Sequence, residues 1–232
     1  MSARVPINIE ALVDQVEKPG LVAAAEQLSE YLGEAAAAGE GWPVYLRFHP
    51  AGGAPADLPA HCVIVTSLLQ EVHRLGEPII ETEARWRAQL GQLQASGAPV
   101  FVCTVFRYVR DQTREGTISP VLERIHRLNR MAMELSHDLG VAVIDLDRAF
   151  ADLGGRTLQT DYRLSGLLAA EVAGHTAAWS LLSFGLDDMI DPELQEKAKT
   201  ILGDLRNIQA LVTRRLARRQ TAQAARQSVP RG

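Results

Sequence analysis

The sequence is poor in aromatic residues, which make up 5% of its 232 residues, and it has only two cysteines. Cys62 and Cys103 lie inside apolar runs and form no CxxC pair, which predicts buried, reduced thiols. No apolar run approaches the roughly 18 residues of a membrane-spanning helix. Residues 1–20 contain Asp, Glu and Pro where a secretory signal needs an apolar stretch. These absences favour a protein of the reducing cytoplasm.

The chain also lacks the short motifs that hold metals, phosphates or dinucleotides. HExxH, EF-hand, Walker A and GxGxxG patterns do not occur, and the six histidines are scattered without metal-ligand spacing. We therefore expect no metal and no cofactor. Asp145 and Asp147 fall on the same side of an expected strand end and could bind a cation, but an architectural role is the favoured interpretation.

Charge is unevenly distributed along the chain. Seven arginines and no acidic residue follow Leu205, so the rest of the chain carries −11 although the whole has a formal net charge of −4. A basic tail on an acidic body predicts an interaction segment. The tail has no interleaved aromatic residues, so we expect no nucleic acid as its partner. An acidic protein surface is favoured over contact with a membrane surface.

Apolar, β-rich runs alternate with helical patterns, and this order predicts an α/β protein. The strands are expected at residues 5–9, 43–48, 61–69, 99–106 and 141–147, and the helices at 19–39, 78–96, 119–139 and 166–184. Continuous apolar strands are buried on both faces, as in parallel sheets. The predicted fold is a flavodoxin-like three-layer α/β/α domain over residues 1–186, with its ligand loops at the carboxyl ends of the strands.

Residues 187–232 show a different pattern. Asp191 is a candidate N-cap, and Pro192 occupies the first helical position. Apolar residues then recur at helical spacing as far as Leu216, which predicts one long amphipathic helix over residues 191–219. This apolar stripe could dock on the body of the protein or on a partner chain, including a second copy, and the sequence leaves both open.

Several stretches resemble, in order, the blocks of SGNH/GDSL-type hydrolases. "GWPVYLRFHPAGG" (41–53) is similar to the second strand with its glycine loop, and "DLPAHCVIVTSLL" (57–69) to the third strand. "RIHRLNRMAMELSHDLGVAVIDLDRAFADLGG" (124–155) and "AGHTAAWSLL" (173–182) resemble the late helix, strand and closing helix. The resemblance covers roughly residues 5–184 and implies acyl-transfer chemistry by a serine, an Asp-x-x-His pair and oxyanion donors.

The residues that this resemblance would make catalytic are mostly replaced. No serine follows the first strand, where the family has its nucleophile, and Glu10 or Asp14 stands near that position. Ser67 falls at a family glycine, and Leu69 falls at the asparagine that would donate to the oxyanion. Four further residues are assigned to the ligand cleft: Gly52, Gly53, Gln70 and Ser165.

The last block keeps an aspartate and loses its histidine. Asp161 matches the catalytic aspartate, and Leu164 stands three residues later where the histidine belongs. His175 lies fourteen residues after Asp161 and matches a non-catalytic Gly-His of the family. A dyad of His49 and Asp57 beside Ser67 is a weaker arrangement.

The leading hypothesis is therefore a catalytically degenerate binding or assembly protein, by analogy within a bacterial surface-polysaccharide system. One alternative is a divergent carbohydrate or lipid esterase that uses Ser67 or Ser165 with His49 or His175. Another is an oligomerising scaffold that acts through residues 191–219. If any catalysis survives, the candidate residues are Asp161, Ser67 and His175.

Overall fold

A five-stranded, all-parallel sheet forms the centre of the protein. The computed structural model describes residues 4–53, 55, 57–110, 119–154, 158–203, 210, 213 and 217. The strands are β1 (Ile7–Leu12), β2 (Val44–Phe48), β3 (Cys62–Ser67), β4 (Val100–Cys103) and β5 (Ala142–Ile144). Their spatial order is β2-β1-β3-β4-β5 with parallel pairing throughout. This is the flavodoxin-like order, so the predicted fold class is confirmed.

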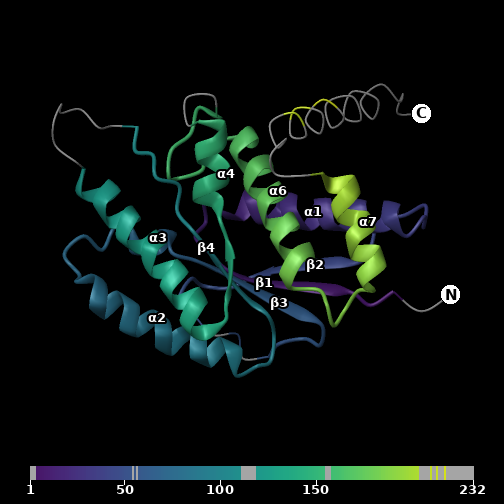
Figure 1. The fold of residues 1–232 in the computed structure, drawn as a ribbon, viewed down its shortest axis with the longest axis horizontal. Coiled ribbons are helices and arrows are strands. Elements are labelled where there is room, and N and C mark those ends of the chain that lie inside the picture. The colour runs from purple at the N-terminus through teal and green to yellow at the C-terminus, as the bar shows by residue number, and fades with distance from the viewer. Residues whose placement is uncertain are drawn as a thin grey trace, which may run out of the picture.

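Helices cover both faces of the sheet, as Figure 1 shows. Helices α1 (Lys18–Ala35), α6 (Leu167–Phe184) and α7 (Pro192–Leu202) lie on one side, and α2 (Ile79–Gln94) and α3 (Pro120–Leu139) lie on the other. Two short helices were not predicted: η1 (Leu69–Glu71) and α4 (Leu146–Leu153). Within the described residues, no helix is long and apolar enough to span a bilayer.

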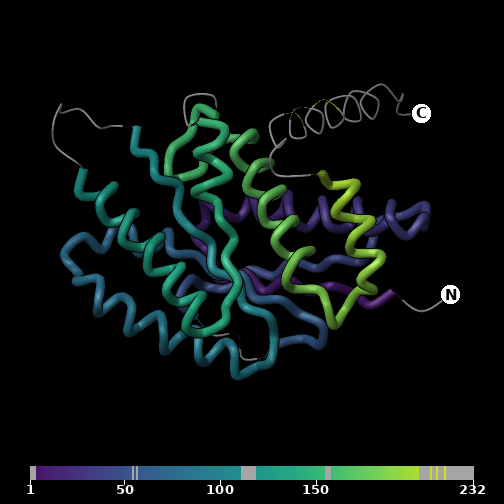
Figure 2. The backbone as a smooth tube through the Cα atoms, viewed as in Figure 1, coloured from purple at the N-terminus to yellow at the C-terminus, as the bar shows by residue number. Residues whose placement is uncertain are grey.

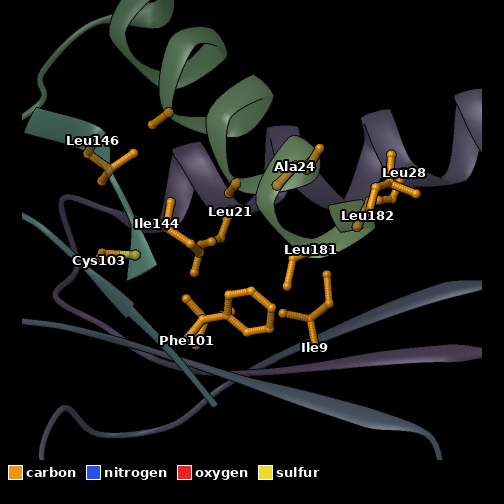
Figure 3. Close-up of a cluster of buried hydrophobic side chains, with 14 of the residues drawn as sticks. Ile9, Leu21, Ala24, Leu28, Phe101, Cys103, Ile144, Leu146, Leu181 and Leu182 are labelled. Carbon is orange, nitrogen blue, oxygen red and sulfur yellow. The ribbon is translucent and has the colours of Figure 1, made fainter. Parts of the chain in front are cut away.

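The larger hydrophobic core lies between the sheet and helices α1 and α6. In Figure 3, Ile9 and Phe101 of the sheet point toward Leu181 of α6, with Leu21 and Leu28 of α1 nearby. A second cluster fills the opposite face, under α2 and α3. Because each central strand is buried on both sides, its sequence reads as a continuous apolar run.

Both cysteines are free and buried, as predicted. Burial raises the pKa of the Cys62 and Cys103 thiols, well above the usual value for Cys103, where nearby Glu17 adds to the effect. A thiol held in its neutral form is a weak nucleophile, so both behave as core residues.

Helices α1 and α6 approach each other through small residues. A Cβ atom added to Gly174 would lie 2.6 Å from the Ala23 Cβ and 2.9 Å from the Ala24 nitrogen. A Cβ atom at Gly20 would lie 2.9 Å from the Ala173 Cβ. The absence of side chains at these two positions lets α1 pack closely on α6, which fixes where each helix begins at the carboxyl edge of the sheet.

The C-terminal helix starts as predicted and ends early. The Asp191 carboxylate accepts a hydrogen bond from the Glu193 amide at 2.9 Å, and Pro192 is the first residue of α7. The helix stops at Leu202 because Gly203 adopts φ +85°. The expectation of one unbroken helix over residues 191–219 is therefore wrong at Gly203. Most of the later residues lie outside the described part of the chain.

Helix α7 docks on the protein's own body. The tube in Figure 2 turns back after α6 and runs beside α1 and α6. Ala198 and Leu202 of α7 are buried in the larger core cluster. The apolar face of α7 is therefore covered by the same chain.

Candidate functional site

The carboxyl ends of β1 and β3 form the natural place for a site. In the order β2-β1-β3, the chain leaves β1 toward one edge of the sheet and later continues from β3 toward the other edge. Ligands of doubly wound sheets bind at such a switch point. Here the loop after β1, Ser67 at the end of β3, and the segment 158–166 before α6 supply the polar groups.

A buried serine and a buried glutamate meet at this switch point. The Ser67 hydroxyl donates a hydrogen bond to Glu17 Oε1 at 2.5 Å. The Leu69 amide donates to Ser67 Oγ at 3.1 Å, and the Asp14 amide donates to Glu17 Oε2 at 3.0 Å. The glutamate therefore links the loop after β1 to the end of β3, and the hydroxyl of Ser67 points at a carboxyl group rather than an imidazole.

The environment of Glu17 favours its protonated form. Burial raises the pKa of Glu17 to about 7, and the charge of Asp14 adds to this rise, although the hydrogen bonds from Ser67 and the Asp14 amide oppose it. Sequence reasoning missed Glu17, because it precedes a helix and falls in no catalytic motif.

Glu10 takes no part in this switch-point cluster. Its carboxylate is buried in β1, 2.6 Å from His49 Nε2 and 2.8 Å from Arg47 Nη2. His49 Nε2 therefore pairs with Glu10, and the weaker arrangement of His49 with Asp57 stays a prediction. Ser67 likewise gains no partner from His49, because its hydrogen bonds go to Glu17 and come from Leu69.

The carboxylate of Asp161 is bound by a neighbouring arginine. The Arg163 amide and Nε each donate to Asp161 Oδ1 at 3.0 Å, and Arg163 also pairs with Oδ2. Burial would raise the pKa of Asp161, but the hydrogen bonds and charge of Arg163, with the charge of Arg110, lower it below its ordinary value. Asp161 is thus an ionised acid whose hydrogen-bonding capacity is used locally.

Leu164 occupies the predicted histidine position in an unusual conformation. Its φ is +52°, a left-handed value that costs on the order of 1–2 kcal/mol for a residue with a Cβ. Its side chain is buried in the larger core cluster, while its amide donates to the Asp161 carbonyl at 2.9 Å. A hydrophobic side chain therefore fills the space beside Asp161, where the resemblance would require a base.

His175 belongs to α6, whereas Asp161 lies in the segment before that helix. It is buried in the middle of α6, one turn after Glu171, whose carboxylate accepts a hydrogen bond from Gln27 of α1 at 3.4 Å. Among the described hydrogen bonds, those to the Asp161 carboxylate come from Arg163, and that of the Ser67 hydroxyl goes to Glu17. None of these bonds involves His175.

The four predicted cleft residues fall into two places. A Cβ atom at Gly52, which has φ +77°, would lie 3.8 Å from the side-chain oxygen of Gln70, so these two residues adjoin. Gly53 closes the same turn by donating to the Pro50 carbonyl at 3.1 Å. Ser165 belongs to a different region, beside Asp161.

A pocket of about 650 Å³ opens beside Asp161 and Leu164. Its lining includes Arg110, Arg163 and Ser165, together with aliphatic groups from the starts of α1 and α6. A volume in this range is typical of small-molecule sites. The sequence pointed to Asp161 and Ser165 here, and missed both arginines.

Asp145 and Asp147 have structural partners. Asp145 caps α4 by accepting from the Arg148 amide at 3.1 Å, and it also accepts from the Thr104 hydroxyl at 3.1 Å. Asp147 accepts from the Arg107 amide at 2.9 Å and pairs with the Arg107 guanidinium. Both aspartates thus hold the ends of β4 and β5 together, which agrees with the architectural interpretation.

Several solved structures superpose on the chain, among them three that have esterase or lipase names. No protein-family model and no curated protein sequence matches the chain. A putative GDSL-like lipase from Parabacteroides merdae superposes with a TM-score of 0.54 at 14% identity, covering 75% of this chain and 94% of the other. A catalytic mutant of Axe2, an acetylxylan esterase from Geobacillus stearothermophilus, gives 0.52 at 12% identity, with 76% and 94% covered. The acetyl xylan esterase AlAXEase gives 0.50 at 14% identity, with 73% and 96% covered.

These similarities establish the fold. The chain has the α/β architecture of GDSL-like hydrolases over most of its described length, as the sequence resemblance predicted. Identities this low carry no residue-by-residue assignment of function.

Proposed function

We propose that this protein is a catalytically degenerate member of the GDSL-like hydrolase fold that binds a ligand or partner at its former active-site edge. One observation carries the proposal: the carboxylate of Asp161 is held by Arg163, and Leu164, three residues later, is buried beside it. In a serine hydrolase, the aspartate must orient a histidine that deprotonates the serine. Here the acid has a permanently charged partner that cannot accept a proton.

The serine at the switch point supports the same proposal. Ser67 is 2% exposed, so its hydroxyl is poorly placed to attack a substrate ester. Its carboxylic partner, Glu17, is also buried, and desolvation favours the neutral form of that group. Below about pH 7 this carboxylic acid is mostly neutral and cannot remove the serine proton.

The names of the structural neighbours suggest a setting. Two of them are acetylxylan esterases, enzymes named for an acylated polysaccharide. We place this protein in the same kind of chemistry, as an accessory to a bacterial surface-polysaccharide system, where it would bind rather than cleave.

Hydrolysis of p-nitrophenyl acetate tests the absence of catalysis. The full chain is assayed at pH 8, where Glu17 is mostly ionised, against Ser67→Ala and a matched variant, Ser165→Ala. We expect all three to show the same background rate. Because Ser67→Ala removes the donor to a buried carboxyl group, thermal unfolding is recorded for each variant. An enzyme-like rate in the wild type that Ser67→Ala alone abolishes would overturn the proposal.

A second candidate function is a divergent esterase, and the 2.5 Å hydrogen bond between Ser67 and Glu17 favours it. An ionised Glu17 could act as the general base if the loop after β1 opened. This reading predicts Ser67-dependent hydrolysis that rises with pH through about 7, as Glu17 loses its proton. A flat pH profile in the same assay would remove it.

A further inference from the structure

The pocket beside Asp161 has an excess of positive charge. Among the described residues that line it, Asp161 carries one negative charge, while Arg110 and Arg163 carry two positive charges. Arg163 is paired with Asp161, whereas Arg110 donates to the neutral carbonyl of Gln159. The described lining of the pocket therefore has a formal charge of +1, because Arg163 pairs with Asp161 and the charge of Arg110 is in excess.

Further hydrogen-bond donors face the same space. Gly166 and Leu167 line the pocket at the start of α6, which has no side-chain cap. Their backbone amides donate to no acceptor within the described part of the chain. The first amides of an 18-residue helix favour an anion, which adds to the effect of Arg110. The Ser165 hydroxyl is a third donor on this rim.

The remaining wall of the pocket is aliphatic. Val16 and Pro19 contribute from the start of α1, and Leu164, Leu167 and Ala170 contribute from the other side. Val16 is 41% exposed and Leu167 is 61% exposed, so both present apolar surface that a ligand could cover. Leu164, whose backbone is in the left-handed region, contributes an apolar side chain to this wall.

We propose that this pocket binds an organic anion with an aliphatic body, its carboxylate or phosphate head held by Arg110 and the donors at the start of α6. The aliphatic part would lie against Val16, Pro19 and Leu167. The inference rests on the proposed function, since it assigns a ligand class to the edge that has lost its catalytic groups. Such ligands include acyl chains released from esters and the phosphate ends of lipids.

Titration by two-dimensional amide NMR with four probes tests the ligand class. Hexanoate and hexyl phosphate carry both features, hexan-1-ol lacks the charge, and acetate lacks the aliphatic body. We expect saturable shifts of the Gly166 and Leu167 amides with hexanoate, hexyl phosphate or both, and the better of the two identifies the head group. Hexan-1-ol and acetate should bind at least about tenfold more weakly. Equal binding of hexan-1-ol, equal binding of acetate, or no saturable shift with either six-carbon anion would overturn the proposal.

Substitutions test which residues bind the ligand. Arg110→Gln should weaken the better anion about tenfold, because it removes a charged hydrogen-bond donor. Leu167→Ser should weaken it roughly threefold to tenfold by removing apolar contact, while leaving acetate unchanged. Arg148→Gln is the matched control, since Arg148 is an exposed arginine on α4 outside the pocket. Identical affinities for Arg110→Gln and Arg148→Gln would contradict the assignment of Arg110.

The ligand titration and the ester-hydrolysis assay test different claims, so one claim can be refuted without the other. Ser67-dependent hydrolysis would refute the proposed function whatever the titration shows. Absence of both hydrolysis and anion binding would refute only the ligand assignment.

Discussion

At the scale of single residues, Ser67 and Asp161 each have a partner within the fold. Ser67 donates to Glu17, and Asp161 accepts from Arg163. The side chain of Leu164 adds no polar atom beside them. These two polar side chains are therefore satisfied by their neighbours, which favours stability over reactivity.

The buried carboxyl group of Glu17 predicts a stability that depends on pH. Its pKa is about 7 in the folded protein and 4.5 as the ordinary value, so the folded state holds its proton more tightly. This contribution is fully present below about pH 4.5 and is lost as the pH rises through about 7. The loss is on the order of 3 kcal/mol.

Glu17→Gln should remove this dependence, because an amide does not ionise. In urea unfolding at pH 5 and pH 8, the stability of Glu17→Gln relative to the wild type should rise by roughly 2–3 kcal/mol toward the higher pH. A constant difference between the two proteins would show that Glu17 ionises normally in the fold.

At the scale of elements, the contact between α1 and α6 positions both sides of the site. Gly174→Ala should destabilise the protein by about 1–3 kcal/mol, because its new methyl group would meet the Ala24 backbone nitrogen at 2.9 Å. Gly91→Ala is the matched control in α2, since its Cβ would meet no atom within 4 Å.

The control should stabilise the protein by about 0.5–1 kcal/mol through the better helix propensity of alanine. Chemical denaturation of both variants measures the difference. Equal effects of the two substitutions would contradict the close approach of the helices.

The sequence predicted most elements, because a strand that is buried on both faces has a continuous run of apolar residues. The predictions were wrong where a short helix or a single glycine determines where an element begins or ends. The apolar run into Asp145 and Asp147 was read as strand, yet α4 begins at Leu146 with Asp145 as its cap. Gly203 interrupts a helical pattern that continues beyond it in the sequence.

The partners within the site were less predictable than the elements. Ser67 and Glu17 are 50 residues apart, and only the packing of α1 against the sheet brings them together. The pair of Asp161 and Arg163 is local, two residues apart, and an arginine so close to the expected catalytic acid was a readable signal. Asp161 and Leu164 lie three residues apart, and the Leu164 amide donates to the Asp161 carbonyl, so their contact is local.

At the scale of the whole molecule, an α/β fold of the kind seen in GDSL-like hydrolases is combined with a basic C-terminal segment. Self-association or protein binding through residues 191–219 stays a prediction, although the apolar face of α7 packs against the protein's own core. Light scattering on a chain truncated after Gly203 tests whether the basic tail causes assembly, because this truncation removes the tail and retains α7. A lower mass than that of the full chain would support assembly through the basic tail.

We propose that no serine of this protein acts as an activated nucleophile. Intact-mass spectrometry after incubation with a fluorophosphonate at pH 8 tests it without any substitution, with an active serine hydrolase in the same tube as the positive control. We expect an unchanged mass for this protein while the control is fully labelled. A single adduct, mapped to Ser67 or Ser165, would contradict it.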